Sequence, residues 1–414
     1  MAYAGSVVTV QRDELLALLT PEAMTLLDDA PAVESSADAL ALVTKLRAAG
    51  GSPEVVAAVV TQSKLRRRAV AKFGPFAERM LFTDAGLQQA TRLQVAAHHA
   101  NRFRQAGAVS VADLGCGIGA DAMAFASLGL EVTAYDLDEV TAAIAAHNLA
   151  PFPNARVKHG RAEDVDLGGF EALWFDPARR TTSAGGTARH FDPADWSPAL
   201  DFVFAAGRER PTGIKLGPGI DHAYLPDDAE TQWVSSGGDL VEATVWMHDT
   251  ARAGIRRSAL VIGKQGTDEL TTSEKVHDAE VGQLGAVLYE PDPAIIRARL
   301  IGDLARSLGA TMISESIAWM TSDEFTSTPF ASAFAVREVL PLHTSSLKSE
   351  LRKRGIGILE IKKRGVDIDP AEFRRKLALK GDLSAVLILT RVGDKRVAIL
   401  ADRLSAGSGP SSEN

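Results

Sequence analysis

Residues 109–138 read VSVADLGCGIGADAMAFASLGLEVTAYDLD. An apolar run leads into a turn with three glycines, an alanine-rich stretch follows, and a second apolar run ends on Asp136. This succession predicts a strand, a glycine turn, a helix and a second strand, which is the opening of a parallel α/β unit. Glycine suits such a turn because a backbone without Cβ atoms can pass close beneath a ligand.

The alternation of strand and helix patterns continues to residue 263 and predicts a doubly wound parallel sheet with an antiparallel addition near its end. We expect strands at 109–116, 131–138, 155–164, 171–179, 212–218, 240–248 and 257–263, and helices at 119–129, 138–150 and 193–210. Residues 264–284 are polar and lack a clear period, which predicts a loop or linker.

The flanking segments have different patterns. Residues 12–105 repeat apolar side chains at helical spacing, and Thr20-Pro21 and Ser52-Pro53 are typical helix starts, in which a hydroxyl precedes a proline. Residues 290–309 predict one capped helix. From residue 331 the order strand, helix, strand, helix, strand, strand predicts an α+β module of ferredoxin-like type.

These patterns together predict an α/β, Rossmann-like protein of several parts. The expected limits are a helical N-terminal domain at 1–105, the α/β domain at 106–265, a linker at 266–288, an α+β region at 289–403 with a basic module at 331–403, and a disordered tail at 404–414.

Composition places the chain among globular proteins without a membrane span. Of 414 residues, 46% are apolar and 24% charged, and no apolar run reaches the roughly 18 residues that a bilayer requires. The first residues lack the basic and apolar regions of a secretory signal. Cys116 is the one cysteine, so neither an intrachain disulfide nor a cysteine-based zinc site is possible. We expect a cytoplasmic protein.

The charges are unevenly distributed. The net charge of −8 argues against a nucleic-acid partner, but residues 332–403 hold 16 basic and 9 acidic side chains, against 29 and 44 in the remainder. A basic module attached to an acidic body is the interpretation that this asymmetry favours.

The spacing of glycines and acids discriminates between cofactors. A dinucleotide loop has a third glycine where this chain has Ala120, and Asp113 stands two places before the first glycine. An acid there attracts the ammonium group of S-adenosylmethionine (SAM) and repels a pyrophosphate. Asp136 can accept both ribose hydroxyls, and Asp164, after the third strand, can accept from the adenine amino group. SAM is the predicted cofactor; NAD or FAD, and a glycine turn without a ligand, are the alternatives.

A second acidic motif, Asp176-Pro177-Ala178-Arg179, ends the fourth predicted strand. In open α/β sheets the chemistry takes place beyond the carboxyl ends of the strands, which places Asp176 beside the transferable methyl group. Because Pro177 has a fixed φ, the acceptor groups before it are held in place to bind an amino group and orient its lone pair. The alternative is that Asp176-Pro177 merely caps the loop that follows.

The sequence also bears on whether the methyl group is transferred to a carbon or an oxygen atom. Methylation of pyrimidine carbon 5 requires a cysteine nucleophile, and the one cysteine lies inside the glycine turn, which argues against that route. Ribose 2′-O methylation commonly uses two lysines, an aspartate and a glutamate. Asp176 and Lys215 fit two of these places, Glu242 falls one strand too early, and nothing in the sequence fixes Lys72 as the second lysine. Lys215 as a strand residue that reaches solvent is the alternative.

Two further stretches precede the glycine turn. Thr83 and Gln89 lie in a segment that we expect to close over the cofactor carboxylate. The basic run at 64–68 is either a solvated helix face or a phosphate contact. His98 and His99 are neighbours on a helix, cannot face one metal together, and are interpreted as ordinary helix residues.

On these motifs the chain resembles the class I SAM-dependent methyltransferases over about 155 residues. The resemblance implies that the cofactor contacts Asp113, Gly115, Gly117 and Gly119 on the methionine side, Asp136 and Leu137 at the ribose, and Ala162 and Asp164 near the adenine. Nucleic-acid amino-methyltransferases carry Asn/Asp-Pro-Pro-aromatic after the fourth strand. This chain is similar in the first half alone, since Arg179 stands where an aromatic residue would stack on a flipped base.

The C-terminal phrases LKSELRKRGIG, EIKKRGVDIDP and FRRKLALKG resemble the THUMP-like domain attached to some bacterial methyltransferases, and MLFTDAGLQQATR and EPDPAIIRA are similar to the same family. THUMP domains proper bind structured RNA, so the resemblance implies a tRNA or rRNA partner. The residues expected to contact RNA are Lys348, Arg352, Lys353, Lys362, Lys363, Arg364, Arg374, Arg375 and Lys380. A charged packing or dimer surface is the alternative.

The sequence thus predicts an RNA methyltransferase that transfers a methyl group by direct displacement onto a nitrogen, without a metal. The expected catalytic residues are Asp176, Pro177, Arg179 and Lys215. The alternatives are a methyltransferase of proteins or small molecules, and a non-catalytic protein that binds SAM and RNA.

Overall fold

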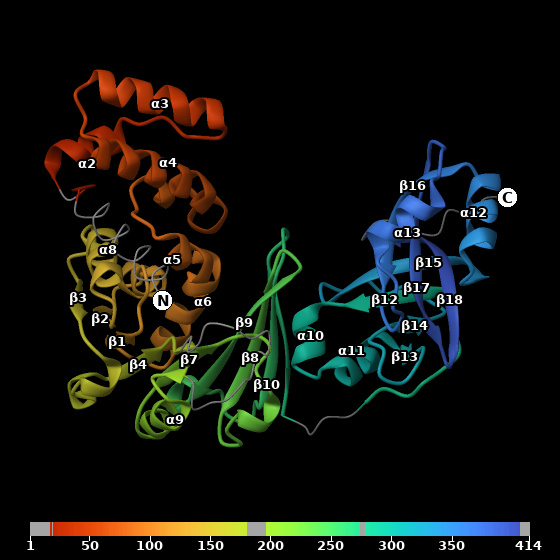
Figure 1. The fold of residues 1–414 in the computed structure, drawn as a ribbon. Coiled ribbons are helices and arrows are strands. Elements are labelled where there is room, and N and C mark those ends of the chain that lie inside the picture. Colours follow the sequence, from red (N-terminus) through yellow and green to blue (C-terminus); the bar gives the residue numbers. More distant parts are fainter. Residues whose placement is uncertain (1–16, 19, 180–195, 274–277, 406–414) are drawn as a thin grey trace. The chain divides into compact units, whose positions relative to one another are not determined.

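The computed structural model describes residues 17–18, 20–179, 196–273 and 278–405 and divides into two compact units (Figure 1). The first comprises Met1–Leu216, Ile220–Ala229 and Thr244–Arg252, and the second comprises the rest. No helix within the described ranges is long and apolar enough to cross a membrane. The tail expected at 404–414 and the helix expected before residue 17 lie, apart from residues 404 and 405, outside the described residues.

The first unit opens with helices, as the sequence predicts. Their bounds are α2 (Pro21–Asp28), α3 (Ser36–Ala48), α4 (Pro53–Phe73), η1 (Gly74–Glu78), α5 (Asp84–Gln89) and α6 (Leu93–Gln105). Both predicted starts are confirmed: the Thr20 hydroxyl accepts from the Ala23 N–H at 3.2 Å, and the Ser52 hydroxyl accepts from the Val55 N–H at 3.3 Å. In each case the side-chain oxygen replaces a hydrogen bond that the first turn cannot make internally.

Five parallel strands of the first unit pair in the order β7-β4-β1-β2-β3. These strands are β1 (Ser110–Leu114), β2 (Glu131–Asp136), β3 (Ala155–His159), β4 (Ala172–Phe175) and β7 (Thr212–Leu216). The α-helices between them are α7 (Ala120–Ser127), α8 (Glu139–Leu149) and α9 (Leu200–Glu209). The short elements between and after them are η2 (Ala162–Asp164), η3 (Leu167–Gly169), β5 (Ala178–Arg179), β6 (Trp196–Ser197), η5 (His222–Tyr224) and η6 (His248–Thr250). Because the strands are parallel, their carboxyl ends meet at one edge, which is where such sheets bind ligands.

A cluster of aromatic rings fills the core beside this sheet. Trp174 of β4 and Trp246 lie 5.9 Å apart between ring centroids, and each is at most 1% exposed. Gly213 of β7 lies against both: a Cβ there would stand 2.7 Å from each indole. Gly213 is therefore required for these two rings to pack against the sheet.

The second unit contains β8 (Glu230–Ser236), β10 (Arg257–Ile262) and β11 (Thr267–Thr272), in which β10 is parallel to β8 and antiparallel to β11. Strand β9 (Asp239–Met247) is divided between the units at residue 244. A seven-stranded sheet has the order β13-β14-β12-β15-β18-β17-β16, with β16 and β17 parallel. Its strands are β12 (Val287–Pro291), β13 (Thr311–Met312), β14 (Met320–Ser322), β15 (Ala331–Pro341), β16 (Ile356–Lys363), β17 (Leu383–Val392) and β18 (Lys395–Leu404).

The helices of the second unit are α10 (Pro293–Arg297), α11 (Ile301–Leu308), α12 (Thr344–Lys353) and α13 (Pro370–Leu377). Leu347 and Phe373, from α12 and α13, belong to one buried apolar cluster, and Trp319 and Phe334 belong to another. Residues of β17 alternate between these clusters, so the seven-stranded sheet is covered on both faces.

Several expectations about individual elements differ from the structure. Strands β8, β11, β12, β13 and β14 were not predicted, and β11 lies inside the expected loop at 264–284. The single helix expected at 290–309 is two helices, because Arg299 adopts a positive φ of 54° between them. The helix expected at 193–210 begins at Leu200: Pro198 restricts the residue before it to extended backbone, and Trp196–Ser197 form β6. Residues 193–195 lie outside the described part.

Gly213→Ala is expected to lower the free energy of unfolding by about 1–3 kcal/mol, because the added methyl group overlaps Trp174 and Trp246. Urea denaturation followed by tryptophan fluorescence measures the loss. Gly169→Ala is the matched control, since a Cβ at Gly169 has no neighbour within 4 Å. Equal stability of the two variants would show that the core does not need this glycine.

Candidate active site

The glycine turn after β1 is built from backbone that L side chains rarely adopt. Gly115, Gly117 and Gly119 have φ values of 95°, 56° and 88°. A Cβ at Gly115 would lie 2.8 Å from the carbonyl oxygen of Asp176, so the turn touches the end of β4 directly. The N–H groups of Gly115 and Cys116 both donate to the Tyr135 carbonyl at 2.9 Å, which ties the turn to β2. The predicted glycines thus form a cradle that a side chain would fill.

Asp113, in β1, is a buried acid. It is 1% exposed, and neither carboxyl oxygen has a hydrogen-bond partner among the described residues. Burial, followed by the negative charges of Asp121 and Asp176, raises the pKa of Asp113 well above its ordinary value. An unsatisfied buried polar group costs about 1–3 kcal/mol, so a ligand that brings an ammonium group here would relieve this cost. The site therefore fits the amino-acid end of SAM.

The carboxylate of Asp136 is held by backbone. Its Oδ2 accepts from the Gly117 N–H and its Oδ1 from the Asp138 N–H, both at 2.9 Å. Burial raises the pKa of Asp136 in spite of these two bonds, which favour the ionised form. The following Leu137 is 53% exposed, an apolar surface beside the carboxylate. A fixed carboxylate next to an exposed apolar side chain can accept the hydroxyls of a ribose while its neighbour packs on the sugar or base.

Asp176 and Lys215 meet at the ends of β4 and β7. Asp176 Oδ2 and Lys215 Nζ are 2.5 Å apart, and the side chains are 32% and 11% exposed. The sequence predicted both residues but not their contact, and the alternative that Lys215 merely reaches solvent is wrong. Pro177 is buried. The Arg179 side chain and Arg180 lie outside the described part of the chain, so that predicted contribution stays a prediction.

Thr91 connects this ion pair to the interior. Lys215 Nζ donates to the Thr91 hydroxyl at 3.0 Å, and the hydroxyl donates to Asp121 Oδ2 at 2.7 Å. Asp121 Oδ1 lies 2.8 Å from His99 Nδ1. Burial opposes ionisation of Asp121, but hydrogen bonds and charge from His99, with Lys215 nearby, lower its pKa below the ordinary value. The sequence analysis missed Thr91 and Asp121, although Thr91 stands in the quoted stretch MLFTDAGLQQATR.

Lys72 of α4 binds the backbone just before Thr91. Its Nζ donates to the carbonyls of Leu87, Gln88 and Ala90 at 2.8, 2.7 and 2.7 Å. Burial, then the positive charges of Lys215 and Arg92, lower the pKa of Lys72 to about 8. Because the charge of Lys215 acts on Lys72, the two lysines lie near each other, as ribose methylation would require. All three ammonium protons are bound to carbonyls, however, so Lys72 holds a helix end and has no lone pair for a hydroxyl proton.

The remaining candidates for the cofactor site are Thr83, Gln89, Ala162 and Asp164. Thr83 is the N-cap of α5, and its hydroxyl accepts from the Gly86 N–H at 2.9 Å. Gln89 is exposed at the end of that helix. Ala162 is buried and Asp164 exposed in η2, after β3, the neighbour of β2. Thr83 also lines a cavity separate from the glycine turn, which does not support its predicted contact with the cofactor. The contacts of Gln89, Ala162 and Asp164 stay predictions.

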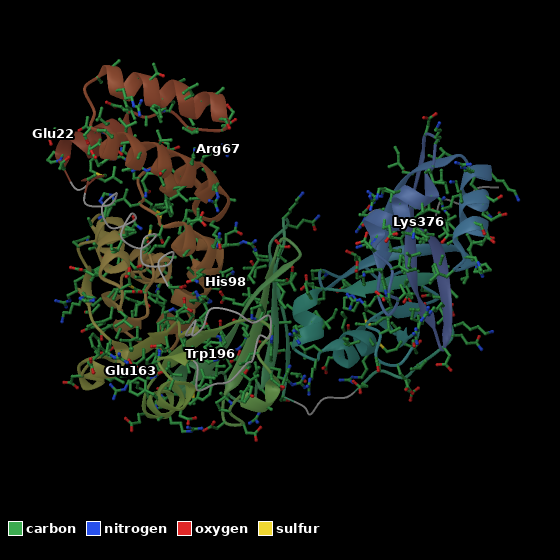
Figure 2. All side chains as sticks on the ribbon, in the orientation of Figure 1. Glu22, Arg67, His98, Glu163, Trp196 and Lys376 are labelled. Atoms are coloured by element: carbon green, nitrogen blue, oxygen red, sulfur yellow. The ribbon has the colours of Figure 1, made fainter. Side chains whose placement is uncertain are left out.

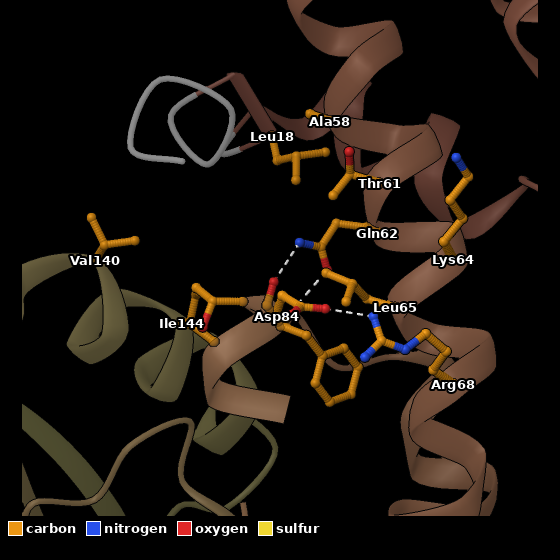
Figure 3. A pocket seen from close by; sticks show the side chains of 12 residues that line it. Leu18, Ala58, Thr61, Gln62, Lys64, Leu65, Arg68, Asp84, Val140 and Ile144 are labelled. Atoms are coloured by element: carbon orange, nitrogen blue, oxygen red, sulfur yellow. Dashed lines mark hydrogen bonds and ion pairs between the residues drawn. The ribbon is translucent and has the colours of Figure 1, made fainter. Parts of the chain in front are cut away.

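A separate cavity of about 210 Å³ lies between α4 and α8 (Figure 3). Part of its polar lining is already paired: Gln62 bonds the Phe82 backbone in both directions, and Arg68 contacts Asp84 at 2.5 Å. The remaining walls are mainly apolar, from side chains such as Ile144. Neither the glycine turn nor Asp176 lines this cavity, so we assign the cofactor to the sheet edge and not to this space.

Several of the nine predicted RNA contacts hold the second unit together. Lys348 and Arg352 of α12 donate to the carbonyls of Lys376 and Ala378 at 3.2 and 3.1 Å, at the end of α13, on which Figure 2 labels Lys376. Arg374 donates to the Leu359 carbonyl at 2.9 Å. These cations stabilise the last turn of a helix or a strand, a structural role that the sequence did not indicate.

The other predicted contacts divide into paired and exposed side chains. Lys353 pairs with Glu350 at 3.0 Å, Lys362 with Glu290 at 2.6 Å, and Arg364 lies 4.0 Å from Glu290. The exposed side chains Lys363, Arg375 and Lys380 make no hydrogen bond or ion pair with the residues that the structure describes. These three are the most accessible cations of the predicted set.

The basic run at 64–68 is also largely used inside the first unit. Arg66 contacts Asp28 at 3.1 Å and donates to the Met80 carbonyl at 3.0 Å, and Arg67 contacts Glu34 at 2.8 Å. His99 is buried against Trp174 with 4.4 Å between ring centroids. Over the described ranges no group of three or more histidine, cysteine or acidic side chains is placed to hold a metal ion.

Known proteins resemble this chain in each of its parts. A family model described as a methyltransferase domain matches residues 111–205, one described as THUMP domain-like matches 331–403, and one for a domain of unknown function matches 11–69. The structure is similar to that of a protein described as a methyltransferase from Porphyromonas gingivalis W83, with a TM-score of 0.71 and 21% identity over 90% of this chain and 100% of that one. At that identity the likeness shows the fold.

A curated relative carries the assignment further. The chain is 33% identical, over 349 residues, to an uncharacterized S-adenosylmethionine-dependent methyltransferase found in two strains of Mycobacterium tuberculosis. The match covers 81% of this chain and 92% of the relative. With the glycine cradle, the buried Asp113 and the fixed Asp136 at the edge of the sheet, this similarity shows that the chain belongs to the SAM-dependent methyltransferases.

Proposed function

We propose that this methyltransferase modifies a nitrogen atom of a structured RNA, tRNA or rRNA. The observation that carries the proposal is the Asp176–Lys215 pair, which stands at the carboxyl ends of two neighbouring strands, with the Asp176 backbone in contact with the cofactor turn. An acceptor bound to Asp176 would therefore lie next to the cofactor.

The chemistry of Asp176 suits an amino group. Asp176 forms an ion pair with the Lys215 ammonium at 2.5 Å, and both oxygens of a carboxylate in such a pair accept hydrogen bonds. An amino group that donates to this carboxylate has its lone pair directed away from it. Orientation of this kind is a major source of rate enhancement in group transfer, because the reacting atoms meet in a productive geometry.

The cofactor would be held by residues of β1, the glycine turn and β2. Asp113 would face its ammonium group, the turn would pass beneath it, and Asp136 would accept the ribose hydroxyls. SAM supplies a methyl group that its sulfonium makes electrophilic, which is chemistry that the protein itself does not need to provide.

The C-terminal module supports RNA as the acceptor. It matches a THUMP domain-like model, and it carries 16 basic against 9 acidic residues over 332–403. Lys363, Arg375 and Lys380 are exposed. Folded RNA is recognised largely by shape and by phosphates, which a basic α+β surface can contact without reading sequence.

Asp136→Ala is expected to weaken SAM binding about 10-fold or more, because it removes a charged acceptor of hydrogen bonds to the ribose. Isothermal calorimetry with SAM measures the change. Glu131→Ala, at the exposed amino end of the same strand, is the control and should bind like wild type. Wild-type affinity in the Asp136 variant would remove the ribose contact from the proposal.

Asp113 is expected to release a proton when SAM binds. Its pKa is raised in the free protein, and a cationic ligand lowers it, so at a pH between the two values up to about one proton leaves per SAM bound. Calorimetry between pH 5 and 8, in two buffers of different ionisation enthalpy, measures this release. Asp113→Asn should abolish it, and the same binding heat in both buffers for wild type would contradict the assignment.

Asp176→Ala is expected to lower methyl incorporation into RNA by roughly 100-fold while SAM still binds, since the acceptor loses its orienting carboxylate. Tritiated SAM and total RNA from cells that lack this protein provide the assay, followed by nucleoside analysis. Asp201→Asn, at an exposed position of α9, is the control. Label found in protein or small molecules but not in RNA would favour the second class of substrate, and no label in any fraction would indicate a non-catalytic protein.

A further inference from the structure

A continuous chain of hydrogen bonds leads from the Asp176–Lys215 pair into the core of the first unit. Its links are Asp176 to Lys215, Lys215 to Thr91, Thr91 to Asp121 and Asp121 to His99, with separations of 2.5, 3.0, 2.7 and 2.8 Å. Each link joins a different element or connecting segment, so the chain fastens together parts that lie far apart in the sequence.

Thr91 links Lys215 to Asp121. Among side chains of this size, only one with a hydroxyl group can make both bonds. Its oxygen accepts from the Lys215 ammonium and its proton goes to Asp121, so it joins a donor with no lone pair to an acceptor with no proton. Thr91 and Asp121 are each 5% exposed. In such a dry environment both bonds are strong, and the loss of either leaves a buried charged group poorly solvated.

The inner end of the described chain, at His99, lies in the packed core. His99 is 1% exposed and lies against Trp174 and Trp246, with centroid separations of 4.4 and 5.9 Å. Rings packed this closely have little freedom to move. Asp121 is therefore anchored to the rigid core, and Thr91 is anchored through Asp121.

Lys72 fixes the same segment from the other side. Its three bonds to carbonyls at residues 87, 88 and 90 define the backbone that leads directly into Thr91. Burial is the main cause of the lowered pKa of Lys72, and the nearby positive charge of Lys215 adds to it. Lys215 is held by its ion pair with Asp176 and by its hydrogen bond to the Thr91 hydroxyl.

We propose that Thr91 is a positioning residue for methyl transfer: it holds the Lys215 ammonium against Asp176, so that the carboxylate is fixed where the acceptor binds. Lys72 supports Thr91 by fixing the backbone before it. This inference rests on the proposed role of Asp176.

The test compares Thr91→Val, which keeps the shape and removes the hydroxyl, with Thr91→Ser, which keeps the hydroxyl. In the tritiated-SAM assay with RNA, Thr91→Val should lower kcat by about 10- to 100-fold, the range expected when a reacting group is displaced by a fraction of an ångström to 1 Å. KM for SAM, and its Kd by calorimetry, should stay within about twofold of wild type. Thr91→Ser should restore most of kcat. Thr44→Val, on the exposed face of α3, is the control for loss of a hydroxyl.

A second variant covers the case in which Thr91→Val does not fold. Lys72→Met keeps the length of the side chain, leaves the Thr91 hydroxyl in place and should lower kcat with unchanged SAM affinity, whereas Lys72→Arg should restore part of it. Thermal unfolding and SAM binding identify variants that are folded.

The outcomes separate this inference from the proposed function. If Asp176→Ala retains full activity, the proposed function fails and Thr91 has nothing to position. If Asp176→Ala is inactive while folded Thr91→Val and Lys72→Met keep kcat within about twofold of wild type, the inference is wrong. A kcat loss in Thr91→Val that serine does not restore also overturns it, because the hydroxyl is then not what matters.

Discussion

In the site, Gly115 lies directly against the carbonyl group of Asp176. A Cβ on the glycine would stand 2.8 Å from that oxygen, so the turn after β1 and the end of β4 can meet only if residue 115 has no side chain. This contact sets the distance between the part of the chain that binds the cofactor and the part that faces the acceptor. The two remaining glycines shape the turn, but Gly115 decides where the turn lies relative to the reaction edge.

Around this contact the first unit gathers three acids whose pKa values are shifted in different ways. Asp121 has Thr91 and His99 as partners and a lowered pKa, whereas Asp113, equally buried, has no described partner and a raised pKa. Partners, not depth, decide which acid carries a charge. Asp136 lies between these cases, with two backbone donors. Burial without partners thus raises the pKa of Asp113, the acid that would face a cationic ligand, whereas hydrogen-bond partners lower the pKa of Asp121.

Features that depend on a short segment of the chain can be predicted from local sequence. The glycine spacing predicts the turn, and the ends of the strands predict where Asp136, Asp176 and Lys215 gather, because parallel strands align their carboxyl ends. The chain Thr91–Asp121–His99 depends on tertiary packing among three separate segments, which no period or motif signals. Strand β8 was missed for a related reason: its residues are almost all buried, so its pattern lacks the alternation of a half-exposed strand.

Basic side chains that bind helix ends recur in both units. Lys72 does so for α5, Arg257 donates to the carbonyls of Ala298 and Arg299 after α10, and Lys348 and Arg352 do so for α13. Carbonyl groups immobilise these cations without neutralising them. Lys348 and Arg352 of α12 are consequently fixed in space by the fold itself. Their rotamer entropy has already been given up in folding, so an anionic molecule that contacted them would pay less of this cost than at a mobile side chain.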